Sequence, residues 1–305
     1  MSNINLSVKI GKLELKNPVL LASGTVGYGN EISQFTDLSK IGGIVTKSIS
    51  LMPRKGNPPQ RVVETTGGML NAIGLANVGV EDFINNKIPF LKEIDSTVIC
   101  NIAASSIEEY VECIRLLEDQ EIIKAYEINV SCPNVKEGGI EFGHNLSALG
   151  SITNKVRSVT QKTVIIKLSP NVSRISDFAK VAKEEGADAV SAINTLVGTA
   201  FDIWTRKPKI KNITGGLSGP AIKPVALAKV LEISRNVNIP IIGIGGIMTW
   251  QDAIEFIIAG ATAIEIGTVN FINPSAGTQI IQGISDYCTK QSISNINEVT
   301  ASYQL

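Results

Sequence analysis

The stretch IPIIGIGGIMTWQDAIEFIIAGATAIEIGT, residues 239–268, contains one complete strand–helix–strand unit. Two short apolar runs, at 239–246 and 261–268, flank an amphipathic segment at 249–260. Continuous apolar runs are typical of parallel strands, which are buried on both faces. The stretch therefore predicts two neighbouring parallel strands that are joined by a helix.

The same alternation extends over most of the chain. Eight strand-like runs are expected, at 18–24, 42–50, 97–105, 125–131, 163–169, 187–195, 239–246 and 261–268. Amphipathic segments, expected to be helices, lie between or after them at 31–41, 106–120, 147–160, 174–186, 223–237, 249–260 and 275–288. This rhythm is typical of α/β folds, and eight such strands in a row favour a closed (β/α)₈ barrel, or TIM barrel, over an open sheet. We expect residues 1–305 to form one barrel domain, because no linker divides the chain.

Three segments depart from the alternation. Residues 1–17 alternate apolar and polar residues and predict an N-terminal β-hairpin. Residues 51–96 and 196–221 are interruptions that follow strands, so they are expected to be insertions over the C-terminal mouth of the barrel. Active sites of barrels form at that mouth, and these insertions are therefore expected to take part in one.

Composition excludes several classes of function. The 28 basic and 28 acidic residues balance, so the chain lacks the excess positive charge that is typical of nucleic-acid-binding proteins, and a small-molecule ligand is expected. The four cysteines form no CxxC pair, and His144 is the only histidine, which argues against a metal or iron–sulfur site and against Ser–His catalysis. The chain has no signal-peptide pattern and no apolar run of the ~20 residues that span a bilayer, so a cytoplasmic protein without a membrane contact is expected.

Polar residues recur at the carboxyl ends of the predicted strands, where a barrel brings them together. They are Ser23, Lys47, Asn101, Asn129, Lys167 and Asn194 with Thr195. Any one of the asparagines or serines can equally be a simple cap or turn residue. The two lysines are harder to explain in that way, because a buried ammonium group needs an anionic partner. We expect a cofactor or an anionic substrate to supply it.

Glycines close the last two predicted strands, at 243–246 and at 267, where Thr268 follows. Barrels often hold a phosphate between these two loops, on backbone N–H groups and a helix N-terminus. Glycines also serve ordinary turns, and neither cluster is a GxGxxG, so direct NAD binding is poorly supported.

Cys132 lies in NVSCPN, residues 129–134, at the end of the fourth predicted strand. Because Pro133 disfavours the helical conformation at the preceding residue, the sulfur of Cys132 can be held toward a ligand and act as a general base. The alternative is that Cys132 is a small packing residue. We interpret Cys100 and Cys113 as packing residues and His144 as a surface or turn residue, whereas the pattern leaves Trp204 and Trp250 undecided between core and interface.

The chain resembles the class 1 dihydroorotate dehydrogenases along essentially its whole length. The resemblance rests on NPVLLASGT (17–25), TKSIS (46–50), GNPPQRVVETTGGMLNAIGLANVGV (56–80), INVSCPN (128–134), IKLSP (166–170), INT (193–195), GGLSGPAIKP (215–224), GIGGI (243–247) and IGT (266–268). The NAIGLANVGV version is most similar to the NAD-linked class 1B catalytic subunit.

The resemblance implies one FMN per chain, across the barrel mouth. Its phosphate would lie on Gly219, Gly245, Gly246, Gly267 and Thr268, and the rest of the cofactor would contact Ser23, Thr46, Lys47, Asn101, Asn129, Lys167 and Ile193. Lys167 would stabilise negative charge on the reduced ring. The substrate would be held by Lys47, which would meet its carboxylate, and by Asn71, Ala72, Ile73, Gly74, Leu75, Asn129, Asn194 and Thr195.

The resemblance also implies an activity, in which Cys132 removes the C5 proton of dihydroorotate while a hydride leaves C6 for the flavin. The product is orotate, an intermediate of de novo pyrimidine (UMP) biosynthesis. In class 1B enzymes the electrons pass to NAD⁺ through a second subunit that carries FAD and an iron–sulfur cluster, in a heterotetramer with two copies of each subunit. The alternatives are a homodimeric class 1A enzyme that reduces fumarate, oxidation of a dihydropyrimidine without a carboxylate, and a barrel that binds an anion without turnover.

Overall fold

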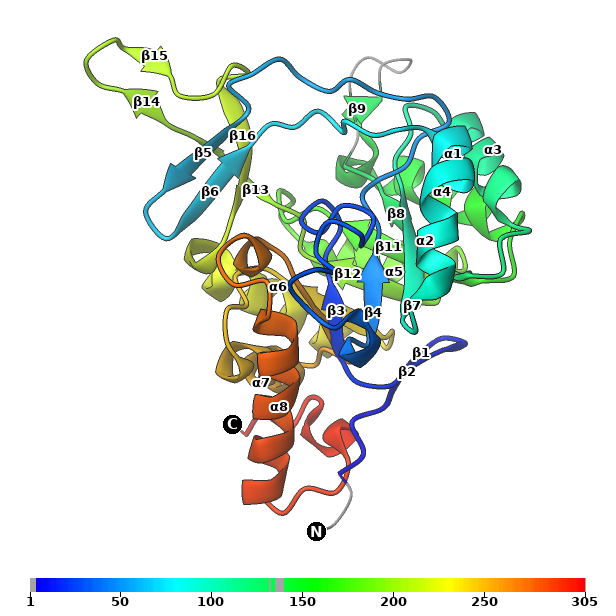
Figure 1. Cartoon of the computed structure of the whole chain (residues 1–305), viewed down its shortest axis with the longest axis vertical. Coiled ribbons are helices and arrows are strands. Elements are labelled where there is room, and N and C mark those ends of the chain that lie inside the picture. Colours follow the sequence, from blue (N-terminus) through cyan, green and yellow to red (C-terminus); the bar gives the residue numbers. More distant parts are fainter. Residues whose placement is uncertain (1–3, 132, 135–139, 305) are drawn as a thin grey trace.

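The computed structural model describes residues 4–131, 133–134 and 140–304, and its centre is a closed barrel of eight parallel strands (Figure 1). Each barrel strand pairs with the next one along the chain, and the last pairs with the first. The strands are β3 (Val19–Leu21), β4 (Gly43–Val45), β7 (Thr97–Ile102), β8 (Ile123–Asn129), β11 (Thr163–Leu168), β12 (Ala189–Ala192), β17 (Ile241–Ile244) and β18 (Ala263–Ile266). The predicted (β/α)₈ barrel is confirmed, and each of the eight predicted strand runs overlaps one of its strands.

Helices pack on the outside of the barrel and bury their apolar faces against it. They are α3 (Ile107–Leu117), α4 (Leu146–Arg157), α5 (Ile175–Glu184), α6 (Lys223–Asn236), α7 (Trp250–Ile258) and α8 (Ala276–Lys290). Each coincides with a predicted amphipathic segment. The start of α7 is fixed by a capping box, in which the side chains of Thr249 and Asp252 each accept a hydrogen bond from the other's backbone N–H.

The prediction of a helix at 31–41 is wrong. The structure has turns there, followed by the single 3₁₀ turn η1 (Leu38–Lys40). Asp37 adopts an extended conformation, and its side chain accepts a hydrogen bond from the Ser39 backbone N–H. A side chain that accepts hydrogen bonds from its local backbone in this way competes with the backbone hydrogen bonds of a helix. The helical spacing of the apolar residues is therefore not enough to produce a helix here.

The predicted N-terminal hairpin is present as β1 (Val8–Ile10) and β2 (Leu13–Leu15). The outer residues of each strand are buried and the middle residue is exposed, as the alternating pattern predicts. Gly11 turns the chain with a φ of 56°, and a β-carbon at this position would lie 2.7 Å from Asp188 Cβ, just before β12 begins. The hairpin therefore packs at the amino-terminal end of the barrel, opposite the mouth.

The two insertions join above the mouth in one antiparallel sheet of order β13-β16-β6-β5. The strands β5 (Val62–Thr65) and β6 (Gly68–Asn71) come from the first insertion, and β13 (Leu196–Thr199) and β16 (Thr214–Ser218) come from the second. The junction is the pairing of β16 with β6, in which Gly216 lies opposite Asn71. Segments about 145 residues apart thus form a single wall above the barrel (Figure 1).

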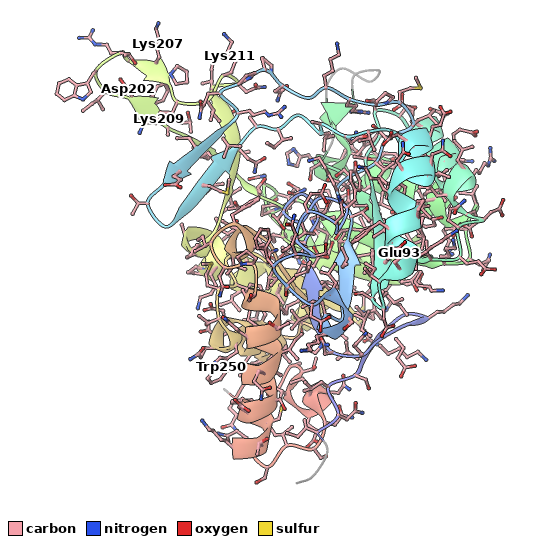
Figure 2. All side chains as sticks on the ribbon, viewed as in Figure 1. Glu93, Asp202, Lys207, Lys209, Lys211 and Trp250 are labelled. Carbon is pink, nitrogen blue, oxygen red and sulfur yellow. The ribbon has the colours of Figure 1, made fainter. Side chains whose placement is uncertain are left out.

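An arm extends from this wall, made of β14 (Phe201–Asp202) and β15 (Lys207–Pro208). In Figure 2 the side chains of Asp202, Lys207 and Lys209 lie on this arm, away from the barrel. Trp204 is 87% exposed in its turn, whereas Trp250 is partly buried, with its ring centroid 6.2 Å from that of Tyr287. The two tryptophans that the sequence left undecided thus lie in opposite environments.

The end of the first insertion is helical, a feature that its Pro-, Gly- and Asn-rich beginning conceals. It forms α1 (Val80–Asp82), the π-helical turn η2 (Phe83–Lys87) and α2 (Ile88–Glu93), which bury Phe83 and Leu91. This helix lies on the outside of the barrel and precedes β7, so it takes the place of the helix in the second strand–helix unit.

The remaining short elements are β9 (Pro133–Asn134), β10 (Ile140–Glu141), η3 (Phe142–His144), η4 (Pro220–Ile222), η5 (Thr268–Phe271) and η6 (Ile296–Val299). Cys100 and Cys113 are fully buried in β7 and α3, which confirms that they are packing residues. Among the helices of the described ranges, none combines the length and the apolar character that crossing a bilayer requires.

Candidate active site

A cavity of about 710 Å³ opens at the carboxyl ends of the barrel strands, beneath the sheet that the insertions form. It is lined by all the polar residues that the sequence places at strand ends, namely Ser23, Lys47, Asn101, Asn129, Lys167, Asn194 and Thr195. Residues 71–75 of the first insertion and residues 214–216, 218 and 219 of the second also line it. The predicted convergence at the mouth is therefore confirmed.

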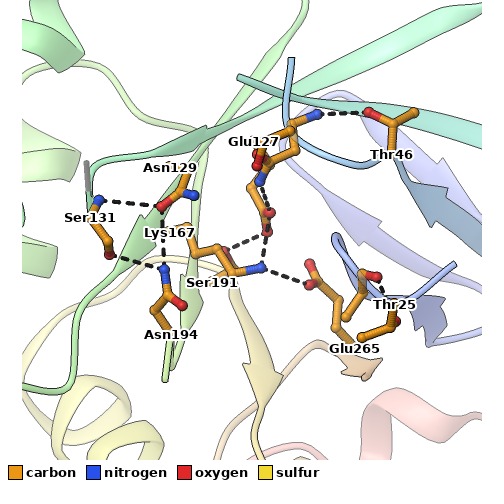
Figure 3. Close-up of polar contacts among 12 residues, drawn as sticks. Thr25, Thr46, Glu127, Asn129, Ser131, Lys167, Ser191, Asn194 and Glu265 are labelled. Carbon is orange, nitrogen blue, oxygen red and sulfur yellow. Dashed lines mark hydrogen bonds and ion pairs between the residues drawn. The ribbon is translucent and has the colours of Figure 1, made fainter. Parts of the chain in front are cut away.

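Lys167 projects from β11 into the barrel interior, at the bottom of the cavity (Figure 3). Its Nζ lies 3.0 Å from Glu127 Oε1 and 3.3 Å from Glu265 Oε2. Both carboxyl groups are fully buried, on β8 and β18. The expectation that a ligand must supply the anionic partner of this lysine is wrong, because the barrel itself supplies two carboxyl groups.

The two carboxyl groups have unequal surroundings. Glu127 accepts hydrogen bonds from Asn101 Nδ2 and, at 2.8 Å, from Ser191 Oγ, in addition to the Lys167 contact. Glu265 accepts from Lys167 alone, and its Oε1 is buried without a hydrogen-bond partner in the described part of the chain. The pairing fixes the Lys167 side chain beneath the cavity.

The pKa values of the three groups follow from this packing. Burial disfavours charge on each of them, but the adjacent carboxylates of Glu127 and Glu265 hold the pKa of Lys167 above its ordinary value. Burial and the neighbouring Glu127 carboxylate raise the pKa of Glu265 well above its ordinary range. Burial also opposes ionisation of Glu127, yet Lys167 and the surrounding donors outweigh it and lower the pKa of Glu127. Lys167 therefore remains cationic at neutral pH.

Lys47 also lines the cavity, two residues after the end of β4. In contrast to Lys167, its ammonium group makes no hydrogen bond or ion pair among the described residues. Burial lowers the pKa of Lys47, and the positive charge of Arg61 lowers it further. A partly buried cation without a partner at the wall of a cavity is suited to bind an anionic group of a ligand.

Asparagines form a connected set of donors and acceptors on one side of the cavity. Asn194 Nδ2 donates to Ser131 Oγ at 2.9 Å and to Asn129 Oδ1 at 3.3 Å, and the Ser131 backbone N–H also donates to Asn129 Oδ1 (Figure 3). The hydroxyl of Tyr110 donates to the Asn129 carbonyl from behind. These contacts hold the amide groups in fixed orientations, which suits a planar ligand with several polar ring atoms.

The loop at 71–75 covers the cavity from the first insertion. Asn71 Nδ2 donates to the Gly216 carbonyl at 3.3 Å, so the loop is tied to the second insertion. Gly74 and Leu75 both have positive φ, 71° and 55°, which turns the loop back over the mouth. All five residues predicted here, Asn71, Ala72, Ile73, Gly74 and Leu75, line the cavity.

Glycines form a second, distinct part of the cavity, next to η4 and η5. Gly219, Gly245, Gly246, Gly267 and Thr268 all line it, as does Ile193. A β-carbon on Gly246, whose φ is 74°, would lie 2.9 Å from the Gly219 carbonyl oxygen, and one on Gly245 would lie 2.7 Å from Ala226 Cβ. Glycine is therefore required at both positions, because the loop after β17 approaches the Gly219 backbone and α6 too closely for a larger residue.

The N–H groups of this glycine cradle are available to a ligand. Over residues 4–131, 133–134 and 140–304, the backbone N–H groups of Gly219, Gly245, Gly246 and Gly267 have no hydrogen-bond acceptor in the protein. Buried backbone donors are rarely left unpaired, so the cradle fits an anion such as a phosphate. The start of α6, directly after η4, adds the positive end of a helix dipole.

Three predicted residues have other placements. Thr46 is fully buried and does not line the cavity, because its Oγ1 instead accepts a hydrogen bond from the Asn101 backbone N–H. Its direct contact with a cofactor stays a prediction. Cys132 lies outside the described residues, so its predicted catalytic role is also untested. His144 is exposed in the turn η3, as expected, with Nε2 3.2 Å from Ser169 Oγ.

Comparison with known proteins identifies the family. A family model described as dihydroorotate dehydrogenase matches residues 5–287. The chain belongs to the dihydroorotate dehydrogenase family. Curated relatives span it almost end to end: a protein of Geotalea daltonii is 51% identical over 305 residues, covering 100% of both chains, and one of Bacteroides fragilis is 48% identical over 301 residues, covering 99% of both. A protein of Thermoanaerobacter sp. is 51% identical over 302 residues, covering 99% of this chain and 100% of its own.

All three relatives carry the name dihydroorotate dehydrogenase B (NAD(+)), catalytic subunit. The resemblance to this family that the sequence motifs indicate is confirmed. The NAD-linked name agrees with the subclass that the motif NAIGLANVGV favours.

Sequence reasoning missed two buried carboxyl groups beneath the cavity and two residues that line it. Glu127 and Glu265 are single charges within the apolar runs AYEIN and AIEI, a signal that was as strong as that of Lys167. Arg54 and Ser105 also line the cavity, where Arg54 Nη2 donates to Ser105 Oγ at 2.8 Å and lies 3.6 Å from Glu109. Arg54 comes from an irregular segment, so no strand pattern could place it there.

Proposed function

We propose that this chain is the FMN-dependent catalytic subunit of an NAD-linked dihydroorotate dehydrogenase, an oxidoreductase that converts dihydroorotate to orotate. The observation that carries the proposal is the single cavity in which an unpaired cation, a set of fixed amides and a glycine cradle lie together. The names of the relatives support the same activity, and their nearly complete overlap with this chain supports carrying it over.

The residues around the cavity fit FMN. The glycine cradle, with Thr268, would hold the phosphate on its free backbone N–H groups. Ser23, Asn101, Asn129 and Ile193 would contact the rest of the cofactor. Lys167 would face the ring from below, where its positive charge favours electron density on the ring. When bound, FMN would supply the hydride acceptor of the reaction.

The substrate would lie between the cofactor and the loop at 71–75. Lys47 would pair with its carboxylate through a charge-assisted hydrogen bond, and Asn71, Asn129, Asn194 and Thr195 would meet its ring amides. The thiol group of Cys132 would act as the base and take the C5 proton while the hydride leaves C6. Dihydropyrimidines without a carboxylate would leave the Lys47 charge unpaired, so they are expected to be poor substrates.

The name catalytic subunit implies a partner subunit in the relatives. For this chain we propose an electron-transfer partner that carries FAD and an iron–sulfur cluster, in a heterotetramer with two copies of each subunit. The described residues contain no group of histidine, cysteine or acidic side chains that could hold a metal, so such a cluster would belong to the partner.

Anaerobic reduction tests the proposed activity. We expect dihydroorotate to bleach the flavin absorbance of the wild-type chain at once and that of Cys132→Ala at least ~100-fold more slowly, because general-base catalysis contributes at least that much. Cys100→Ala is the matched control, since Cys100 is buried away from the cavity and should bleach normally. A wild-type chain that binds FMN but does not bleach would refute the proposed substrate.

The electron acceptor is tested separately. Purified alone, the chain is expected to reduce NAD⁺ negligibly, and to gain that activity when the partner subunit is added. Rapid fumarate reduction by the isolated chain would instead select the homodimeric class 1A alternative. A chain that takes up no FMN on reconstitution would favour an anion-binding barrel without turnover.

A further inference from the structure

The cluster of Glu127, Lys167 and Glu265 contains two carboxyl groups and one ammonium group in the barrel interior. Both glutamates are fully buried and Lys167 is nearly so. If all three groups were ionised, the cluster would hold one uncompensated negative charge in a medium of low polarity, which is strongly unfavourable. The charge is removed if one of the two carboxyl groups keeps its proton at neutral pH, where a carboxyl group with an ordinary pKa would lose it.

The hydrogen bonds indicate which carboxyl group holds the proton. Glu127 is surrounded by donors, from Asn101, Lys167 and Ser191, and these stabilise a carboxylate. Glu265 accepts a hydrogen bond only from Lys167, its other charged neighbour is the Glu127 carboxyl group, and its Oε1 is buried without a hydrogen-bond donor in the described part of the chain. An ionised oxygen left bare in this way would be costlier than a neutral one.

Among the described residues, no titratable group outside the cluster compensates its charge. The strands that flank β18 in the barrel are β17 and β3, and neither carries a titratable side chain. The charged groups that act on Glu265 are Glu127 and Lys167, and their carboxyl and ammonium groups interact with it directly. The protonation of Glu265 therefore depends on the cluster itself.

We propose that Glu265 is a buried proton-holding residue, so that Glu127, Lys167 and Glu265 together carry no net charge beneath the cavity. Glu127 and Glu265 are positioning residues, because they act on a ligand through Lys167. A neutral cluster lets the Lys167 ammonium attract negative charge in the cavity, whereas a cluster with both carboxylates ionised would repel it. The consequence for the flavin rests on the proposed function, but the protonation of Glu265 does not.

Infrared spectroscopy of the FMN-free protein tests the proton directly. We expect a carbonyl band of a protonated carboxylic acid at neutral pH, and a shift of that band when glutamate is labelled with ¹³C. The band should be lost in Glu265→Gln and kept in Glu14→Gln, a control on the exposed face of β2. Absence of the band from the wild-type protein, or its persistence in Glu265→Gln, would overturn the proposal.

Unfolding identifies the protonated residue. In Glu265→Gln a neutral amide replaces a neutral acid, so the midpoint of thermal unfolding should change little. In Glu127→Gln an amide N–H₂ group must face one of the donors that now bond the carboxylate, so the midpoint should fall by a much larger amount. Equal or greater destabilisation by Glu265→Gln, including failure to fold, would place the proton elsewhere and refute the proposal.

The flavin provides the functional measurement. In the FMN-loaded wild-type chain, the midpoint reduction potential should fall more steeply at the alkaline pH at which Glu265 ionises, because the cluster then becomes negative and disfavours the reduced anion. Glu265→Gln should lack this extra fall. An identical profile in the two proteins would contradict the coupling. If no FMN binds, the proposed function fails, and the infrared and unfolding results still decide whether Glu265 holds a proton.

Discussion

Lys47 and Lys167 follow similar apolar strands and line the same cavity, but the protein treats their charges differently. Lys167 is held between two buried carboxyl groups, whereas Lys47 has no ion pair among the described residues. The pKa of Lys167 is raised by its partners, and that of Lys47 is lowered by burial and by Arg61. The difference supports the proposal that Lys167, fixed by its two carboxyl partners, faces the cofactor, and that Lys47 binds the substrate.

The largest effect is expected when the paired lysine is removed. Lys167→Met leaves the Glu127 carboxylate buried without its cation, which should lower the free energy of unfolding by about 3–5 kcal/mol. Chemical denaturation measures it. The double variant Lys167→Met/Glu127→Gln removes both charges and should recover part of the loss. Additive losses in the double variant would show that the two residues do not depend on each other.

Removal of the unpaired lysine should have the opposite sign. Lys47→Met deletes a partly buried charge that makes no ion pair among the described residues and whose burial outweighs the attraction of Glu31, so the free energy of unfolding of the ligand-free chain should stay the same or rise, by at most about 1 kcal/mol. Lys207→Met, on the exposed arm, is the matched control and should change nothing measurable. A clear loss of stability in Lys47→Met would mean that Lys47 has a structural partner after all.

A smaller effect concerns pH. The folded pKa of Lys47 lies below its unfolded value, so its buried charge opposes folding at neutral pH, and this cost is lost as pH rises from the folded pKa to the unfolded pKa. Ligand binding should show the reverse trend, because only the protonated ammonium pairs with a carboxylate. The affinity for orotate should therefore fall at a lower pH than for an ordinary lysine. In Lys47→Arg that fall should move to higher pH, since guanidinium stays protonated.

The barrel could be predicted from sequence because each of its strands is a short apolar run that ends in a polar residue or glycine. That same regularity located Lys47, Asn129, Gly245 and Gly267 at one mouth. The pairing of β6 with β16 could not be predicted, because it joins two irregular insertions that are distant in sequence. The Lys167 partners were missed for a different reason: the ammonium group was expected to need a ligand, although Glu127 and Glu265 are single charges within two other apolar strand runs of the same barrel.

The proposed assignment of Lys47 to the substrate and of Lys167 to the cofactor is tested most directly with the FMN-loaded Lys47→Met variant. Orotate is titrated into this variant while the flavin absorbance is followed. We predict that this variant retains FMN and binds orotate about 10- to 100-fold more weakly than wild type, because it loses a charged hydrogen bond of about 1.5–3 kcal/mol. An unchanged orotate affinity, or a loss of FMN instead of orotate, would contradict the assignment of Lys47 to the substrate.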